Sequence, residues 1–100
     1  MRAVNALKFE WDETKNEANR RKHGVSFQES QSVFADEFGR LVADPDHSQD
    51  EDRFVLLGMS VLLRVLVVCH CYRHGDTVRI ISARKANRSE RNQYEGYKYA

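Results

Sequence analysis

The feature that most constrains this chain is a long apolar run from Phe54 to Tyr72. It has the length of a membrane span, but Arg64 stands near its middle, where a charge is costly in lipid. Gly58 and Ser60 also interrupt the run and favour a turn. The run therefore predicts two strands of a water-soluble sheet, from Arg53 to Met59 and from Leu62 to Arg73, with Gly58-Met-Ser60 at the turn.

Helix-capping signals flank this pair of strands. Asp12 and Gly24 mark the two ends of a first helix, while Ser26-Phe-Gln-Glu29 and Asn87-Arg-Ser-Glu90 are capping boxes that open two more. The length of 100 residues predicts one domain, residues 1–100. In chain order we expect an extended segment 7–11, helices 13–23 and 27–34, strands 40–43, 53–59, 62–73 and 77–83, and a helix from 88 to about 97. This is an α+β fold with two N-terminal helices, a four-stranded antiparallel sheet and a C-terminal helix.

The third strand has two unlike faces, because successive side chains of a strand point to opposite sides. One face is wholly apolar, and we expect it to pack against the helices. The other is mixed and holds an arginine and a histidine. The apolar set is Val65, Val67, Cys69 and Cys71, and the mixed set is Arg64, Leu66, Val68, His70 and Tyr72.

Arg64 and Arg79 fall on neighbouring antiparallel strands in this scheme. If the register puts both on one face, their guanidinium groups can clamp a phosphate. Otherwise each arginine lays its stem along the sheet and pairs with a nearby acid. The register is left open by the sequence, and so is this choice.

Charge is unevenly distributed along the chain, although the formal net charge is only +1. Residues 1–53 hold 12 acids and 8 bases, whereas residues 54–100 hold 3 acids and 8 bases. Such an asymmetry indicates a charged partner, or merely solvated faces that segregate.

The acidic segment Asp44–Asp52 does not match a calcium loop, since Gln49 replaces the required glycine. His47 has no second zinc ligand at a suitable spacing, so we expect no metal site.

Cys69 and Cys71 are too close on one strand to form a disulfide without strain. Two free thiols, together with the absence of a signal peptide, predict a cytoplasmic protein.

Three titratable side chains could perform acid–base chemistry. His23 ends the first helix, where an imidazole can move protons near neutral pH or simply cap the helix dipole. Asn19, one turn earlier, could orient its ring. Glu90 and Tyr94 share a face of the last helix, and either could serve in catalysis, while the tyrosine could equally pack on the sheet.

Several uncommon residues fall together in a recognisable order. They are Phe9-Glu-Trp-Asp-Glu13, Lys15-Asn16, Asn19, Lys22-His-Gly-Val-Ser-Phe27, Val33-Phe34, Asp46-His47, Arg53, Gly58, Arg64, Arg79-Ile-Ile-Ser-Ala-Arg-Lys-Ala86, Glu90 and Tyr94. In this pattern the chain resembles the BrnT family of toxins from bacterial type II toxin–antitoxin modules, from Phe9 to about Tyr97.

The resemblance implies a compact fold similar to that of RelE toxins and a ribonuclease that cuts RNA and stops translation. It also implies a cognate BrnA-type antitoxin with a ribbon-helix-helix region. Dimerisation of that antitoxin would give a heterotetramer, and operator DNA would be bound only through the antitoxin. We expect no cofactor and no membrane partner.

Carried onto this sequence, the resemblance makes two sets of residues site candidates. The permitted chemistry is metal-free cleavage, in which a base activates the ribose 2′-hydroxyl and cations stabilise the charged phosphorane. We assign the phosphate to the two arginines and proton transfer to the histidine, with the glutamate as a competing base. Catalytic candidates are His23, Arg64, Arg79, Glu90 and Tyr94; RNA-binding candidates are Trp11, Lys22, Arg84 and Lys85.

Two other functions compete with this interpretation. A non-catalytic module could hold a protein or an RNA on the sheet face. Direct DNA-binding repression is the third possibility, but the chain lacks a helix-turn-helix pattern.

Overall fold

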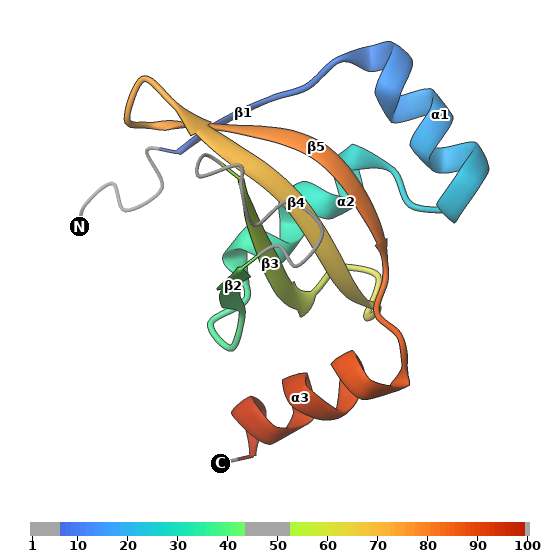
Figure 1. Cartoon of the computed structure of the whole chain (residues 1–100), viewed down its shortest axis with the longest axis vertical. Coiled ribbons are helices and arrows are strands. Elements are labelled where there is room, and N and C mark those ends of the chain that lie inside the picture. Colours follow the sequence, from blue (N-terminus) through green and yellow to red (C-terminus); the bar gives the residue numbers. More distant parts are fainter. Residues whose placement is uncertain (1–6, 44–52, 100) are drawn as a thin grey trace.

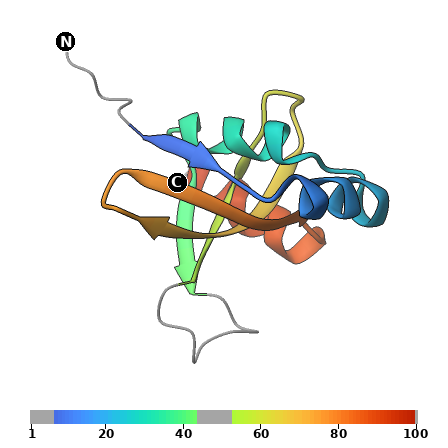
Figure 2. The ribbon, with the colours of Figure 1, turned by 90° about the horizontal axis from the view of Figure 1, so that it is seen from above.

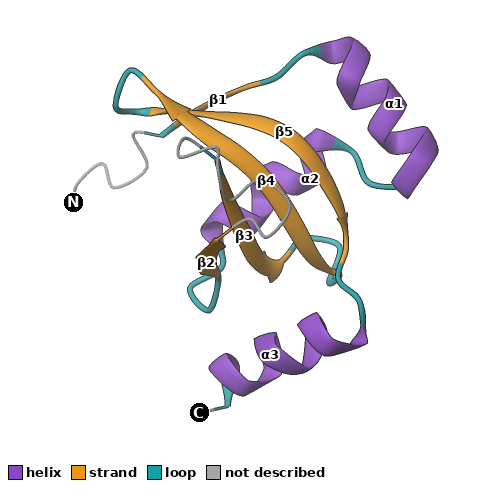
Figure 3. Cartoon of the chain, in the orientation of Figure 1, coloured by secondary structure: helices purple, strands orange, loops and turns teal. Residues whose placement is uncertain are grey.

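The structure, a computed structural model, describes residues 7–43 and 53–99. Figure 1 shows the helices arranged around one twisted sheet, and Figure 3 separates helices from strands by colour. The acidic segment Asp44–Asp52, with Asp46 and His47, lies outside the described residues. In chain order the elements are β1 (Lys8–Glu10), α1 (Glu13–His23), α2 (Phe27–Ser32), the 3-10 helix η1 (Val33–Ala35), β2 (Arg40–Ala43), β3 (Phe54–Met59), β4 (Val65–Arg73), β5 (Thr77–Lys85) and α3 (Arg88–Lys98).

The sheet has five strands in the order β1-β5-β4-β3-β2. Strands β2 to β5 form the predicted antiparallel meander, but β1 adds a fifth strand parallel to β5, with Phe9 opposite Val78. The α+β class is confirmed, whereas the expectation of four antiparallel strands is wrong. A three-residue strand paired with a distant segment leaves only a weak trace in local sequence.

The helix boundaries follow the capping signals. The Asp12 carboxylate accepts the backbone N–H of Thr14 at 2.8 Å, and Gly24 ends α1 with φ of 70°. At α3, Asn87 and Glu90 form the complete reciprocal capping box. At α2, Ser26 accepts the backbone N–H of Glu29, and the helix gives way to η1 after Ser32 rather than running to Phe34.

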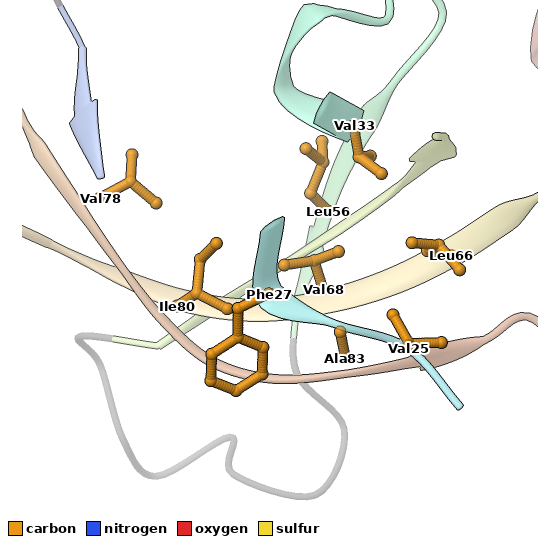
Figure 4. Close-up of a cluster of buried hydrophobic side chains, with 9 residues drawn as sticks. All are labelled: Val25, Phe27, Val33, Leu56, Leu66, Val68, Val78, Ile80 and Ala83. Atoms are coloured by element: carbon orange, nitrogen blue, oxygen red, sulfur yellow. The ribbon is translucent and has the colours of Figure 1, made fainter. Parts of the chain in front are cut away.

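Both faces of the sheet are covered, each by a different helical layer. On one face the segment leading from α1 through α2 to η1 packs against the central strands, and Figure 4 shows this cluster. Its buried members are Val25, Phe27, Val33, Leu56, Leu66, Val68, Val78, Ile80 and Ala83. On the other face α3 packs through a smaller cluster of Val55, Leu57, Val67, Ala86 and Tyr94.

The two faces of β4 therefore differ from expectation. Leu66, Val68 and His70, from the mixed set, face α2 and η1 and are fully buried. Val65 and Val67, from the apolar set, face α3 instead. The prediction that the apolar set alone faces the helices is wrong, because a strand covered on both sides has no solvent face to reveal the orientation.

An extra residue in β5 changes its alternation. Cys69 pairs with Ser82, but His70 pairs with Ile80, so Ile81 has no partner across the ladder. Such a bulge moves the following side chains to the opposite face from that expected by simple alternation. As a result, Arg84 pairs with Val67 on the α3 face.

None of the helices within 7–43 and 53–99 is long and apolar enough to cross a membrane.

Candidate active site

Arg64 occupies the centre of a polar network where four elements meet. It follows the turn after β3, and its Nε donates to the Glu29 Oε2 at 2.9 Å, while Nη2 contacts Oε1 of the same carboxylate. Nη2 also donates to the carbonyl of Gly24 at 3.0 Å. One guanidinium group therefore fixes the β3–β4 turn against α2 and against the residue that follows α1.

Glu29 is the anion of this network. Its side chain is 6% exposed, and its Oε2 also accepts the hydroxyl of Ser60 at 2.6 Å. Burial opposes ionisation, but the hydrogen bonds from Arg64 and Ser60 and the charges of Arg64 and Lys85 outweigh it and hold the pKa of Glu29 below its usual range. Glu29 is therefore ionised near neutral pH and holds Arg64 in place.

Other basic residues adjoin this pair. Lys22 and His23 form the end of α1, directly before the Gly24 carbonyl that Arg64 binds. Lys85 ends β5 opposite Leu66, on the same face as α2, and its charge acts on Glu29. We call Lys22, His23, Arg64 and Lys85 the basic cluster. Glu29 balances the charge of Arg64, and Lys22 and Lys85 add positive charge to the cluster.

The end of α1 is held in this position by Asn19. Its amide donates to the carbonyls of Val25 and Ala83, both at 2.8 Å, and its Oδ1 accepts the backbone N–H of Ala83 at 3.1 Å. The amide thus joins α1 to β5 and does not orient the ring of His23, contrary to expectation. Asn16 plays a similar part at α2, where it accepts the N–H of Phe27 at 2.8 Å.

Arg79 lies on the opposite face of the sheet from Arg64. It pairs in register with Cys71, and its Nη1 donates to Glu10 on β1 at 3.0 Å. Arg73 contacts the same carboxylate at 3.9 Å. The conditional phosphate clamp of Arg64 with Arg79 is therefore not formed, and each arginine pairs with its own acid instead.

Arg84 and Glu90 form a second polar group, on the α3 face. The guanidinium donates to both carboxylate oxygens, at 2.8 and 2.9 Å. These bonds lower the pKa of Glu90, aided by the backbone N–H of Asn87, while partial burial opposes them. A carboxylate stabilised in its charged form is a weak proton acceptor, so Glu90 is poorly suited to act as a base.

Tyr94 and Trp11 occupy packing positions. Tyr94 is 1% exposed, and its hydroxyl donates to Asp36 Oδ2 at 2.7 Å. Burial and this hydrogen bond raise the pKa of Tyr94 above its usual range. Trp11 meets the ring of Phe27 edge-on, with centroids 6.1 Å apart, and its indole N–H donates to Glu13.

The structure thus places Arg64 and Lys85 beside Glu29, with Lys22 and His23 at the adjoining end of α1. It places the candidates Arg79, Arg84, Glu90 and Tyr94 on the other face of the sheet. Sequence reasoning missed Glu29 and Ser60. Glu29 was recognised only as a capping-box residue, and nothing local signals that its carboxylate meets an arginine 35 residues away. Within the described segments, no three His, Cys, Asp or Glu side chains gather closely enough to hold a metal ion.

Comparisons with known proteins address the class of this chain. Residues 11–90 match the family described as the ribonuclease toxin BrnT of type II toxin–antitoxin systems. Among solved structures, the chain is similar to the Brucella abortus ribonuclease toxin BrnT, with a TM-score of 0.65 and 23% sequence identity, over 82% of this chain and 99% of that chain. That similarity supports the fold. No curated protein matches the sequence. Because the family match spans most of the chain, this protein belongs to the BrnT family of ribonuclease toxins of type II toxin–antitoxin systems.

Proposed function

We propose that this toxin cuts RNA without a metal ion, and that the basic cluster is its active site. The observation that carries the proposal is the contact of Arg64 with Glu29 and the Gly24 carbonyl. This contact fixes a cation beside the end of α1, where His23 and Lys22 lie. Cleavage needs one group that binds the phosphate and one that accepts a proton. The cluster offers Arg64 for the first task and His23 for the second.

The reaction begins at the ribose 2′-hydroxyl. His23 takes its proton, the 2′-oxygen bonds to phosphorus, and the bond from phosphorus to the 5′-oxygen breaks. The leaving 5′-oxygen takes up a proton from water, and the other product ends in a 2′,3′-cyclic phosphate. Arg64, Lys22 and Lys85 stabilise the additional negative charge of the phosphorane, which is greatest in the transition state. DNA lacks the 2′-hydroxyl and is not cut.

Arg64 has a favourable position for this task because its orientation is set before RNA arrives. A buried, ionised carboxylate holds two of its nitrogen atoms, so little rotamer entropy is lost on binding a phosphate. Glu29 is accordingly a positioning residue.

The biological role follows from the family. RNA cleavage stops translation and growth, and a cognate BrnA-type antitoxin neutralises the toxin, with operator DNA bound through the antitoxin. Expression of the toxin alone is expected to arrest growth, and co-expression of the antitoxin is expected to restore it.

The test compares two faces of the sheet. Purified toxin is incubated with RNA in the presence and absence of EDTA, and the 3′ ends of the products are analysed. We expect cleavage to survive chelation and to yield cyclic phosphates. His23→Ala should reduce the rate by about 100-fold or more, the usual worth of a general base. Arg64→Lys should reduce it while retaining a positive charge beside Glu29.

Arg79→Ala is the matched control, since Arg79 is also a partly exposed arginine paired with a glutamate, on the other face. It should retain cleavage. Loss of activity in Arg79→Ala, with activity kept in His23→Ala, would move the site to the opposite face. Binding of RNA without any cleavage would support the non-catalytic module instead.

A further inference from the structure

The turn between β3 and β4 exposes three consecutive aliphatic side chains. Val61, Leu62 and Leu63 are 71%, 61% and 79% exposed. We call these three residues the apolar tip. In Figure 2 this turn, drawn in yellow, projects beyond the sheet on the side of α2. Adjacent exposed apolar residues at one projecting turn indicate an interaction surface more strongly than scattered ones do.

Hydrogen bonds hold the base of the apolar tip. Ser60 and Arg64 are joined by a backbone bond of 2.8 Å, and the Leu63 N–H donates to the Ser60 carbonyl at 2.9 Å. The Val61 N–H donates to the hydroxyl of Ser32 on α2 at 2.8 Å. The tip is therefore presented on an ordered support, and little backbone entropy would be lost when a partner binds.

Leu63 has a backbone conformation that is unfavourable for leucine. Its φ is 63°, in the left-handed region that glycine and asparagine tolerate better. The turn between β4 and β5 also contains positive φ angles, at His74 (56°) and at Gly75 (81°). Leu63 thus combines a strained backbone with an exposed apolar side chain, a combination that occurs at binding surfaces.

Two different surfaces flank the apolar tip. On the side of Val61 is an open cleft of about 570 Å³ between η1 and α3. Its lining includes apolar side chains, such as Phe38 and Met59, and the charged residues Asp36, Glu37 and Lys98. On the other side Leu63 precedes Arg64, whose guanidinium lies against Gly24 and leads to the rest of the basic cluster. A ligand bound across the tip would thus meet apolar side chains and positive charges together.

We propose that the apolar tip anchors a neutralising segment of the antitoxin, which places apolar side chains on the tip and acidic side chains on the basic cluster. The proposal rests on the proposed function, because it explains inhibition as occlusion of that active site. RNA fits the tip poorly, since three aliphatic side chains offer neither hydrogen bonds nor charge to a nucleotide. An acidic and apolar protein segment satisfies both surfaces.

The experiment uses the full toxin and the BrnA-type antitoxin proposed as its partner. The test variant combines Leu62→Ser with Leu63→Asn, and the matched control is Leu41→Ser, which removes an aliphatic side chain 54% exposed on the edge strand β2. Calorimetry measures antitoxin affinity, RNA cleavage measures the active site, and thermal unfolding measures the fold. A 2′-O-methyl RNA oligonucleotide that cannot be cut serves as a competitor.

We expect the tip variant to bind the antitoxin at least tenfold more weakly, with cleavage unchanged and with equal or higher thermal stability. The control should bind like the unaltered toxin. Antitoxin binding should weaken as salt concentration rises, and the uncleavable RNA should compete for the toxin.

Equal antitoxin affinity of the tip variant and the unaltered toxin would overturn the proposal. Loss of cleavage in the tip variant would overturn it as well, by assigning the tip to substrate. If the unaltered toxin fails to cut RNA, the proposed function fails, while the affinity comparison still reports on the tip.

Discussion

Helices α1 and α3 have the same length of 11 residues, but they attach to the sheet by different physical means. The buried residues of α1 are two asparagines, Asn16 and Asn19, whose amides bond to neighbouring backbone. The buried residue of α3 is Tyr94, which packs in an apolar cluster and makes one hydrogen bond to Asp36. Figure 1 shows α1 alongside β5 and α3 beyond the end of that strand.

The two kinds of attachment differ in how precisely they position a helix more than in how strongly they hold it to the sheet. Hydrogen bonds depend steeply on distance and angle, whereas apolar contact is non-directional and tolerates small shifts. The helix that carries Lys22 and His23 is the one fixed by directional bonds to the next element and to β5. We infer that the placement of α1 is tuned for the basic cluster, and the placement of α3 is governed mainly by burial.

The largest effect is expected from Asn19→Ala. The substitution leaves two carbonyls and one N–H without their partner in a buried setting, and we expect a loss of about 3 kcal/mol of unfolding free energy. Urea denaturation measures it. The control Glu17→Ala, which breaks an exposed pair with Arg20 on the same helix, should change stability by no more than about 0.5 kcal/mol. A cost below 1 kcal/mol at Asn19 would contradict the hydrogen-bonded docking of α1.

Acid should destabilise the fold in two stages. Burial lowers the pKa of His70 below 6.5, so the unfolded chain takes up a proton first and stability falls as the pH drops below about 6.5. Glu29, Asp36 and Glu90 have lowered pKa values, so a second loss begins near pH 4.5 and continues as the pH falls. Urea titrations at a series of pH values measure both. His70→Gln should remove the first stage alone, and its persistence would refute this assignment.

Tyr94→Phe tests the polar contact made by the buried residue of α3. Asp36 keeps its bonds from the backbone N–H groups of Phe38 and Met59, so we expect a loss of only about 1.5 kcal/mol. Tyr97→Phe is the matched control, because it keeps the ring that packs beneath Arg40. Thermal unfolding should show a lower midpoint temperature for Tyr94→Phe than for Tyr97→Phe. If Tyr94→Phe cost as much as Asn19→Ala, the two helices would not differ in the way described.

The smallest effect should be a gain from Gly96→Ala in α3. Nothing lies within 4 Å of the position a Cβ would take, and alanine reduces the entropy of the unfolded chain. We expect stabilisation by about 0.5–1 kcal/mol in a denaturant titration. Gly24→Ala, where φ is 70°, should destabilise by a similar amount. A loss at Gly96 would show that α3 packs more tightly than its contacts indicate.

Local signals predicted the helix ends well because capping is a local interaction. Asp12, Gly24 and the Asn87–Glu90 pair perform the predicted roles. The β3–β4 pair was also predicted, since alternation and length define strands. The predicted turn at Gly58-Met-Ser60 is wrong, because Gly58 and Met59 belong to β3, the turn spans residues 60–64, and β4 begins at Val65 rather than Leu62. The parallel strand β1 and the bulge at Ile81 depend on pairing across the chain, which no local pattern specifies.

The candidate site shows the same division between features with a local signal and features that depend on distant contacts. His23 and Arg64 were predicted as site residues, and they lie in the same cluster. Their arrangement depends on Glu29 and on the docking by Asn19, whose partners are 35 and 64 residues away along the chain. The register that would have united Arg64 and Arg79 was undetermined, and a strand buried on both faces gives no hydropathy signal to choose it.

The pairing of β1 with β5 has a consequence for the timing of synthesis. Lys8 pairs with Thr77, and Asn19 bonds to Ala83. The elements β1 and α1, which are synthesised early, therefore depend on β5, which is synthesised much later. A growing chain on the ribosome therefore carries α1 without the backbone that anchors it, and Lys85 joins the basic cluster later still. Contacts between such distant segments form only when both have emerged. A toxin proposed to stop translation thus gains its active arrangement only after β5 has been made, and products truncated before β5 are expected to be harmless.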